Sequence, residues 1–285
     1  MTSLTTNYYK LIGPKQLIME EAVIELTSAD EYLVQTLCSA ISPGTETAAY
    51  AGLESLRPGS IYPRVVGYCN LGKVIQVGED VHSVKRNDLI LTFQSHRTTF
   101  KQKDCDFSMV MPAGILPEKV VTAYLFHLGL HAIQTAEVRA GHHVGIIGLG
   151  TLGLTTALMT NLANAQVFVF SNQQKPGSLN KKGMHFFSKS ITHETEVQQL
   201  TQNTGLDIII NTSNTWSDWK LGLQLLRKGG VIVNLGFPGR GEPLPDFNPL
   251  DPQYLYFKSI QIKPLQYIDE TNASPEVFRF NMKRN

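Results

Sequence analysis

The sequence has few cysteines, almost no net charge and no long apolar run. Its three cysteines, Cys38, Cys69 and Cys105, form no Cys-x-x-Cys pair, so we expect neither a disulfide framework nor a four-thiolate zinc lobe. A formal net charge of +1 gives no reason to expect nucleic acid or an anionic membrane as a partner. The first ten residues lack the apolar core of a secretion signal, and no run approaches the roughly 20 apolar residues of a membrane span. We therefore expect a cytoplasmic protein.

The length of 285 residues and the 42% apolar content suit two globular domains. Up to about residue 112, short apolar stretches alternate with Gly, Pro, Asn and Asp, which is typical of β structure without a long helix. After Pro117 the apolar residues follow a helical spacing as far as Glu137. We expect one domain over residues 1–117 and a second over 118–265.

From His143 onward, apolar strands alternate with helical stretches, ending in a strand expected over Lys258–Leu265. This alternation is typical of an α/β domain with a doubly wound parallel sheet, covered by helices on both faces. The sequence therefore predicts a Rossmann domain for the second half of the chain.

A glycine-rich motif, G-x-G-x-x-G, lies at the first strand-to-helix turn of this predicted domain. Its residues are Gly148, Leu149, Gly150, Thr151, Leu152 and Gly153. An apolar strand precedes the motif and an apolar helix follows it, which is the context that a dinucleotide site requires. Glycines let the backbone approach a pyrophosphate, which then rests on the N–H groups at the helix N-terminus.

The end of the second strand, Gln166–Phe170, decides which dinucleotide we expect. An NAD site normally has Asp or Glu there, whereas this sequence continues Ser171-Asn172-Gln173-Gln174-Lys175. No acidic residue occurs from Leu154 to His193. Hydroxyl, amide and ammonium groups suit a 2′-phosphate, so we predict NADP(H), bound through Ser171, Asn172 and Lys175. We expect the remaining lysines of this stretch to be solvated; they are Lys181, Lys182 and Lys189.

Three stretches, residues 41–52, 62–88 and 141–236, resemble the medium-chain dehydrogenase/reductase superfamily, also called zinc-type alcohol dehydrogenases. The run Ser42-Pro43-Gly44-Thr45-Glu46 is most similar to the zinc-independent branch that includes bacteriochlorophyllide dehydrogenase and its relatives in biosynthetic clusters. The resemblance implies a GroES-like β-barrel for the first domain and a Rossmann domain for the second, with the active site between them.

The sequence departs from the zinc-dependent members of this superfamily at their metal ligands. Ser42 stands where they have a cysteine, and Gly67-Tyr68-Cys69 stands where they have Gly-His-Glu. A hydroxyl and a phenol do not replace a thiolate and an imidazole as zinc ligands, so we expect no metal. Hydrogen-bond donors would then polarise the substrate oxygen.

The resemblance also implies roles for individual side chains. Thr45 matches the proton-relay hydroxyl, the phenol of Tyr68 would face the same site, and Glu46 would orient Thr45 or a water. Each has a structural alternative: Thr45 could only hold a turn, Tyr68 could be a packed aromatic, and Glu46 could be an ion-pair partner. Strand ends that would line the ribose and nicotinamide are Asn211, Thr212, Leu235, Gly236 and Phe237.

Together these features favour an oxidoreductase that moves hydride between NADP(H) and a small organic carbonyl or alcohol. Two alternatives remain: a reductase of an activated C=C bond, and a non-catalytic NADP(H)-binding protein. Superfamily members continue well beyond the last Rossmann strand, so we expect residues 266–285 to return, as a shortened segment, toward the first domain. We further expect a homodimer joined along an apolar edge strand over Tyr254–Leu265. Its anchors would be Tyr256, Phe257, Ile260 and Ile262.

Overall fold

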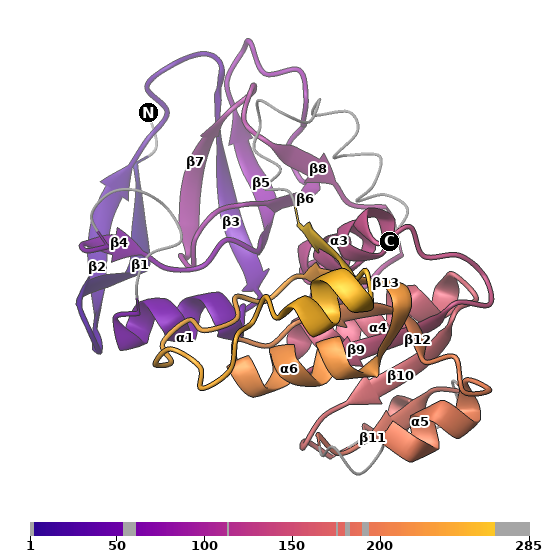
Figure 1. The fold of residues 1–285 in the computed structure, drawn as a ribbon. Helices are drawn as coiled ribbons and strands as arrows, with labels where there is room; N and C mark the ends of the chain where they lie inside the picture. Colours follow the sequence, from indigo (N-terminus) through magenta and orange to yellow (C-terminus); the bar gives the residue numbers. More distant parts are fainter. Residues whose placement is uncertain are drawn as a thin grey trace. The chain divides into compact units, whose positions relative to one another are not determined.

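The computed structural model describes residues 3–53, 61–112, 114–174, 176–179, 183–189 and 194–265 (Figure 1). These residues fall into two compact units, which divide between Tyr124 and Leu125. The expected return of residues 266–285 lies outside the described residues. Within the described ranges, no helix has both the length and the apolar character that crossing a membrane requires.

The first unit contains two antiparallel sheets, which agree with the expected GroES-like domain. One has the order β2-β1-β4 and comprises β1 (Leu4–Gly13), β2 (Gln16–Ile24) and β4 (Arg64–Val65). The other has the order β7-β3-β5-β6-β8. Its strands are β3 (Glu31–Ser39), β5 (Asn70–Val77), β6 (Leu89–Thr92), β7 (Thr99–Lys103) and β8 (Ser108–Val110). The larger sheet supplies fully buried side chains such as Tyr32, Leu71, Ile90 and Phe100, which form the core.

One helix of this unit, α1 (Pro43–Ala51), contradicts the expectation of β structure throughout residues 1–112. Pro43 occupies the first helical turn, where its fixed φ favours a helix start, and Gly52 ends the helix with φ +79°. The helix buries only the small residues Ala48 and Ala49. Because small side chains make no apolar stripe, the periodicity that normally reveals a helix is absent.

The second unit is built on a parallel sheet with the order β11-β10-β9-β12-β13-β14. Its strands are β9 (His143–Ile147), β10 (Gln166–Phe170), β11 (His185–Phe187), β12 (Leu206–Asn211), β13 (Leu226–Asn234) and β14 (Gln261–Pro264). In chain order this is the 3-2-1-4-5-6 arrangement of dinucleotide-binding sheets, which confirms the predicted doubly wound parallel sheet.

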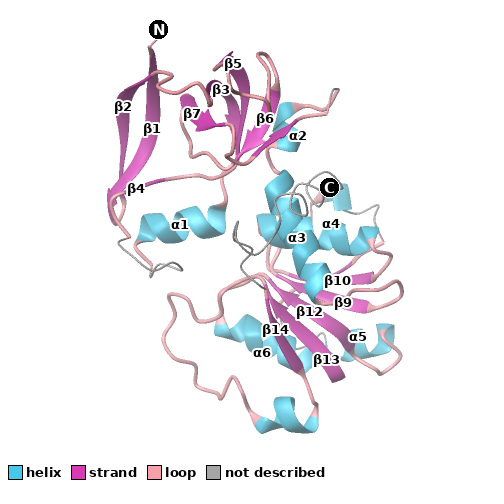
Figure 2. Cartoon of the chain, turned by 90° about the horizontal axis from the view of Figure 1, so that it is seen from above, coloured by secondary structure: helices cyan, strands magenta, loops and turns pink. Residues whose placement is uncertain are grey.

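Helices cover both faces of this sheet (Figure 2). They are α3 (Ala123–Thr135), α4 (Thr151–Leu162), α5 (Glu194–Leu200) and α6 (Trp216–Leu225); the short α2 (Pro117–Val120) precedes them, and η1 (Gly177–Leu179) follows β10. Successive strand residues alternate between two apolar clusters. Ile146 packs with Ala132 of α3 and Ala157 of α4, whereas Ile147 packs with Val197 of α5 and Trp219 of α6. The predicted helix of residues 118–137 is therefore α2 followed by α3.

The last strand is shorter than the sequence suggested. Residues Gln253–Phe257 form a helical turn, η3, and only Gln261–Pro264 form β14. Ser259 has φ +54°, which turns the chain between the two elements. Tyr254 and Ile260 are buried against the second unit's own core, while Tyr256 and Phe257 are 77% and 70% exposed. The expected edge strand starting at Tyr254 is therefore wrong. The apolar residues from 254 to 260 lie in the helical turn and in the bend after it, and the strand begins only at Gln261.

Candidate dinucleotide site and hydroxyl cluster

The carboxyl ends of β9, β10 and β12 meet at the glycine-rich turn. Gly148 follows β9 with φ +97°, and its N–H donates to the carbonyl oxygen of Phe170 at 2.9 Å. The Thr212 hydroxyl donates to the carbonyl oxygen of Ile147, also at 2.9 Å. A Cβ at Gly148 would lie 2.6 Å from Thr212 Oγ1. The backbone of the turn thus packs against the Thr212 side chain, and position 148 has room only for glycine.

The other two glycines of the motif differ in what surrounds them. A Cβ at Gly153 would lie 2.0 Å from the carbonyl oxygen of Gly148. A Cβ at Gly150 would have no described atom within 4 Å. Gly150 is also the N-cap of α4 and has no side chain to accept from the first N–H groups of the helix. The open side of the turn therefore offers free backbone donors to an anion.

Not every predicted residue of the motif presents its side chain there. Leu149 is 7% exposed and belongs to the core, whereas Thr151 is exposed and Leu152 half-buried. Leu149 can therefore contact a ligand through its backbone but not through its side chain.

The ends of β12 and β13 lie against each other beside the turn. The N–H of Gly236 donates to the carbonyl oxygen of Asn211 at 2.8 Å, and the Asn211 amide donates to Asn234 Oδ1 at 3.3 Å. Leu235 is buried, and Phe237 is 45% exposed. The structure therefore brings the predicted strand-end residues to one edge of the sheet, although the Leu235 side chain turns into the core.

One backbone contact to β11 and two side-chain contacts hold the loop after β10. Ser171 N–H donates to the carbonyl oxygen of Phe187 at 2.9 Å, and Ser171 Oγ accepts from the N–H of Gln173 at 3.0 Å. Asn172 Oδ1 accepts from the N–H of Lys189 at 3.0 Å. Lys175 lies outside the described residues, as do Lys181 and Lys182.

Lys189 is not the solvated lysine that we expected. Its Nζ lies 2.5 Å from Oδ2 of Asp218, with side-chain exposures of 22% and 4%. Asp218 belongs to the first turn of α6, so tertiary packing brings a carboxylate to a stretch whose own sequence has none. The ammonium of Lys189 compensates that charge.

In the first unit, three hydroxyl groups gather between α1 and the segment before β5. Burial raises the pKa of the Tyr68 phenol, and hydrogen bonds with the side chains of Ser42 and Thr45 oppose part of this rise. The ring of Tyr68 packs edge-on against Tyr124, with 5.5 Å between centroids. Thr45 and Tyr68 are therefore neighbours, although 23 positions separate them in the sequence.

Glu46 contacts a histidine that the sequence did not identify as its partner. Its Oε1 accepts from the N–H of Ser42 at 2.7 Å, and its Oε2 lies 2.8 Å from Nε2 of His96. The other ring nitrogen of His96 lies 2.8 Å from Ser39 Oγ. His96 follows β6 in a loop and belongs to no motif, so only the folded contacts identify it.

Cys69, next to Tyr68, is 1% exposed and packs with Leu71, Leu91 and Met109. Burial, with a smaller contribution from the charge of Glu46, raises the pKa of its thiol to about 12. The thiol therefore stays protonated at neutral pH. Across the described part of the chain, no three His, Cys, Asp or Glu side chains gather in a way that could hold a metal ion.

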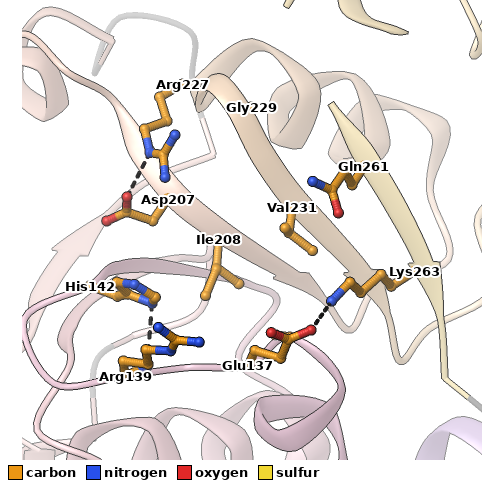
Figure 3. Close-up of a pocket in the computed structure, with 11 residues that line it drawn as sticks. Glu137, Arg139, His142, Asp207, Ile208, Arg227, Gly229, Val231, Gln261 and Lys263 are labelled. Atoms are coloured by element: carbon orange, nitrogen blue, oxygen red, sulfur yellow. Dashed lines mark hydrogen bonds and ion pairs between the residues drawn. The ribbon is translucent and has the colours of Figure 1, made fainter. Parts of the chain in front are cut away.

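A hollow of about 220 Å³ lies at the amino ends of β12, β13 and β14 (Figure 3). Ion pairs of 2.6 Å between Arg227 and Asp207, and between Lys263 and Glu137, form part of its lining. The glycine-rich turn follows the carboxyl end of β9, so the hollow opens at the other edge of the sheet and includes no predicted site residue.

Comparison with known proteins gives a family match and distant relatives. Residues 151–281 match the family described as "Zinc-binding dehydrogenase". L-galactonate-5-dehydrogenase of Escherichia coli (strain K12) is 26% identical over 184 residues, which cover 55% of this chain and 53% of that protein. The NADP-dependent isopropanol dehydrogenase of Thermoanaerobacter brockii is 19% identical over 227 residues, covering 66% and 64%. The chain thus spans between half and two thirds of the length of these curated relatives.

Solved structures show the same fold. An alcohol dehydrogenase from Thermotoga maritima has a TM-score of 0.80 and 18% identity, covering 99% of this chain and 90% of that chain. A protein from Sinorhizobium meliloti 1021, described as a zinc-binding dehydrogenase bound to NADP, also has a TM-score of 0.80 and 18% identity, covering 98% and 88%. These likenesses establish an α/β fold with a GroES-like and a Rossmann-like part.

Proposed function

We propose that this chain is an oxidoreductase. The family match and the curated relatives support its membership of the zinc-binding dehydrogenase family. It would transfer hydride between NADP(H) and a small organic carbonyl or alcohol, as part of a biosynthetic pathway. Residues 118–265 would hold the cofactor, and residues 1–117 would supply the substrate-facing groups. The observation that carries the proposal is the glycine-rich turn. It leaves no space for a Cβ atom at Gly153 but has free space at Gly150, and it belongs to a sheet with the strand order of dinucleotide-binding domains.

The residues at the sheet edge fit NADP(H). The free N–H groups of the first turn of α4 would bind the pyrophosphate, and Ser171, Asn172 and Lys175 would meet the 2′-phosphate. Asn211, Thr212, Gly236 and Phe237 would face the ribose and nicotinamide. When bound, the nicotinamide accepts or donates the hydride. Support for NADP(H) over NAD(H) also comes from a relative named as an NADP-dependent dehydrogenase and from a structural neighbour bound to NADP.

The side chains at the expected metal positions do not fit zinc. Ser42 and Tyr68 offer hydroxyls, and the Cys69 thiol keeps its proton in an apolar cluster. We therefore propose zinc-independent chemistry, in which the hydroxyls of Thr45 and Tyr68 donate hydrogen bonds to the substrate oxygen. Glu46 would orient the first turn of α1, because it accepts from the Ser42 N–H.

The substrate class is tested by following NADPH oxidation, with ketones and aldehydes compared against enones and quinones. The proposal expects turnover of saturated carbonyl compounds. Turnover of enones or quinones alone would support reduction of an activated C=C bond instead. Tight NADPH binding without turnover of any compound would support the non-catalytic alternative.

We also propose that the chain forms a homodimer along β14, because this edge strand pairs only with β13 among the described strands. The exposed rings of Tyr256 and Phe257 would add apolar contact next to it. Light scattering at micromolar concentration checks this proposal, and a monomer mass would contradict it.

A further inference from the structure

His96 contacts both of the segments that carry the hydroxyl cluster. On one side its Nε2 lies 2.8 Å from Glu46 Oε2, one residue after Thr45. On the other side, a Cβ at Gly67 would lie 2.6 Å from Cδ2 of His96, so the backbone just before Tyr68 packs directly on the ring. The N–H of His96 also donates to the carbonyl oxygen of Val66 at 2.8 Å.

Hydrogen bonds at both ring nitrogens fix the orientation of the His96 ring. With Glu46 ionised, Nε2 carries the proton and donates to the carboxylate, and in the neutral ring Nδ1 then accepts from the Ser39 hydroxyl at 2.8 Å. The side chains of His96 and Glu46 are only 12% and 15% exposed, so water has little access to either. The imidazole therefore links the end of β3, helix α1 and the segment before β5.

The carboxylate of Glu46 connects the His96 ring to the N-terminus of α1 through hydrogen bonds. One oxygen accepts a hydrogen bond from Nε2 of His96, and the other accepts from the N–H of Ser42 at 2.7 Å. Ser42 is the N-cap of the helix and Thr45 lies in its first turn, and both side chains neighbour the Tyr68 phenol. A shift of the His96 ring would thus move the Ser42 and Thr45 hydroxyls on one side and the Tyr68 phenol on the other.

We propose that His96, held by Ser39 and Glu46, is a positioning residue that sets the distance between the hydroxyl of Thr45 and the phenol of Tyr68. As a role in catalysis this rests on the proposed oxidoreductase function. Replacement of His96 by Leu still fills the position with a bulky side chain but removes both hydrogen bonds. Replacement by Gln keeps an amide donor for Glu46.

The experiment compares His96→Leu, His96→Gln and Ser39→Ala with the wild type, and uses His82→Leu, an exposed histidine of the same unit, as the control. We expect His96→Leu to lower kcat by about 10- to 100-fold, because small misplacements of reacting groups are costly. NADPH affinity should stay unchanged. His96→Gln should restore most of the rate, and Ser39→Ala should cost about two- to tenfold, as the loss of one hydrogen bond does.

A second measurement does not depend on turnover. Chain labelled with ¹³C at the tyrosine Cζ gives an NMR signal for Tyr68, assigned with Tyr68→Phe. This signal should shift in His96→Leu and remain in place in His82→Leu. An unchanged Tyr68 signal and kcat in His96→Leu, or a lower melting temperature alone, would overturn the proposal. If His96→Leu does not fold, the same two readouts in Ser39→Ala decide. Absence of turnover in the wild type would contradict the proposed function, while the Tyr68 signal would still decide the role of His96.

Discussion

A Cβ atom at Gly153 would lie 2.0 Å from the carbonyl oxygen of Gly148, so the turn that begins α4 closes only around glycine. Gly153→Ala must push the helix away from β9. We expect a loss of about 1–3 kcal/mol in the free energy of unfolding, as for other overpacked sites, and strongly weakened NADPH binding. Chemical denaturation and a fluorescence titration measure the two effects.

The matched control for this variant is Gly150→Ala. A Cβ there meets no described atom within 4 Å, and the backbone has an ordinary φ of −68°. Stability should therefore fall much less than in Gly153→Ala, by no more than the cost of a poorer N-cap, while a methyl group on the open side of the turn should weaken NADPH binding. Equal loss of stability in both variants would contradict this reading of the turn.

Cofactor preference follows from the groups at the end of β10. NADPH should bind at least tenfold more tightly than NADH, a difference of about 1.4 kcal/mol, if Ser171 and Lys175 meet the 2′-phosphate as proposed. Ser171→Ala and Lys175→Ala should each lower NADPH affinity and leave NADH affinity unchanged. Fluorescence titrations with both cofactors measure this, and equal affinities in the wild type would refute it.

Purified protein should contain no stoichiometric zinc, and a chelator should leave NADPH binding and turnover unchanged. The reason is the donor set: Ser42 and Tyr68 are hydroxyls, and burial raises the pKa of the Cys69 thiol to about 12. Elemental analysis of protein purified without chelators provides the measurement. One zinc ion per chain, lost together with activity on chelation, would show that these residues are not the metal positions.

Acid should destabilise the first unit through Glu31. Burial alone would raise the pKa of this carboxyl group, but hydrogen bonds from Thr27 and the ammonium of Lys101 lower it from 4.5 to about 2. A lowered pKa in the folded state stabilises the fold above pH 4.5, and this contribution is lost as the pH falls toward 2. Glu31→Gln should therefore unfold with a flatter pH dependence between these values. Melting curves from pH 6 to about pH 2 test this, and parallel curves for the two proteins would contradict it.

The centre of the parallel sheet could be predicted because β9, β10 and β12 are short apolar runs followed by turn signals. The same reasoning failed where the pattern depends on tertiary packing. Helix α1 buries only two alanines, so it has no apolar stripe. The apolar residues from Tyr254 to Ile260 resemble a strand in sequence, but Ser259 turns the chain between them.

The candidate site shows the same division. The glycine motif is local, so its residues could be named from the sequence. The pairs Glu46–His96 and Lys189–Asp218 join residues that are 50 and 29 positions apart, and no spacing rule connects them. Thr45 and Tyr68 could be named only through a resemblance, and the structure adds that their side chains are neighbours.

Removal of the two hydroxyls tests the proposed chemistry most directly. If the chemistry is zinc-independent, as proposed, the charge that develops on the substrate oxygen must be met by hydrogen-bond donors. Loss of one such donor commonly costs 10²–10³ in kcat, about 2.7–4 kcal/mol. Burial raises the pKa of Tyr68, so its phenol keeps the proton that a donor needs. We therefore expect Thr45→Val and Tyr68→Phe to lower kcat strongly.

NADPH affinity should stay nearly constant in both variants, because Thr45 and Tyr68 belong to the first unit and the glycine-rich turn to the second. Tyr9→Phe is the control, since Tyr9 belongs to the same unit and is 46% exposed. Steady-state kinetics give kcat, and a fluorescence titration gives the affinity. Wild-type rates in both variants would mean that neither hydroxyl is the donor, and the proton would then come from a water or from the substrate itself.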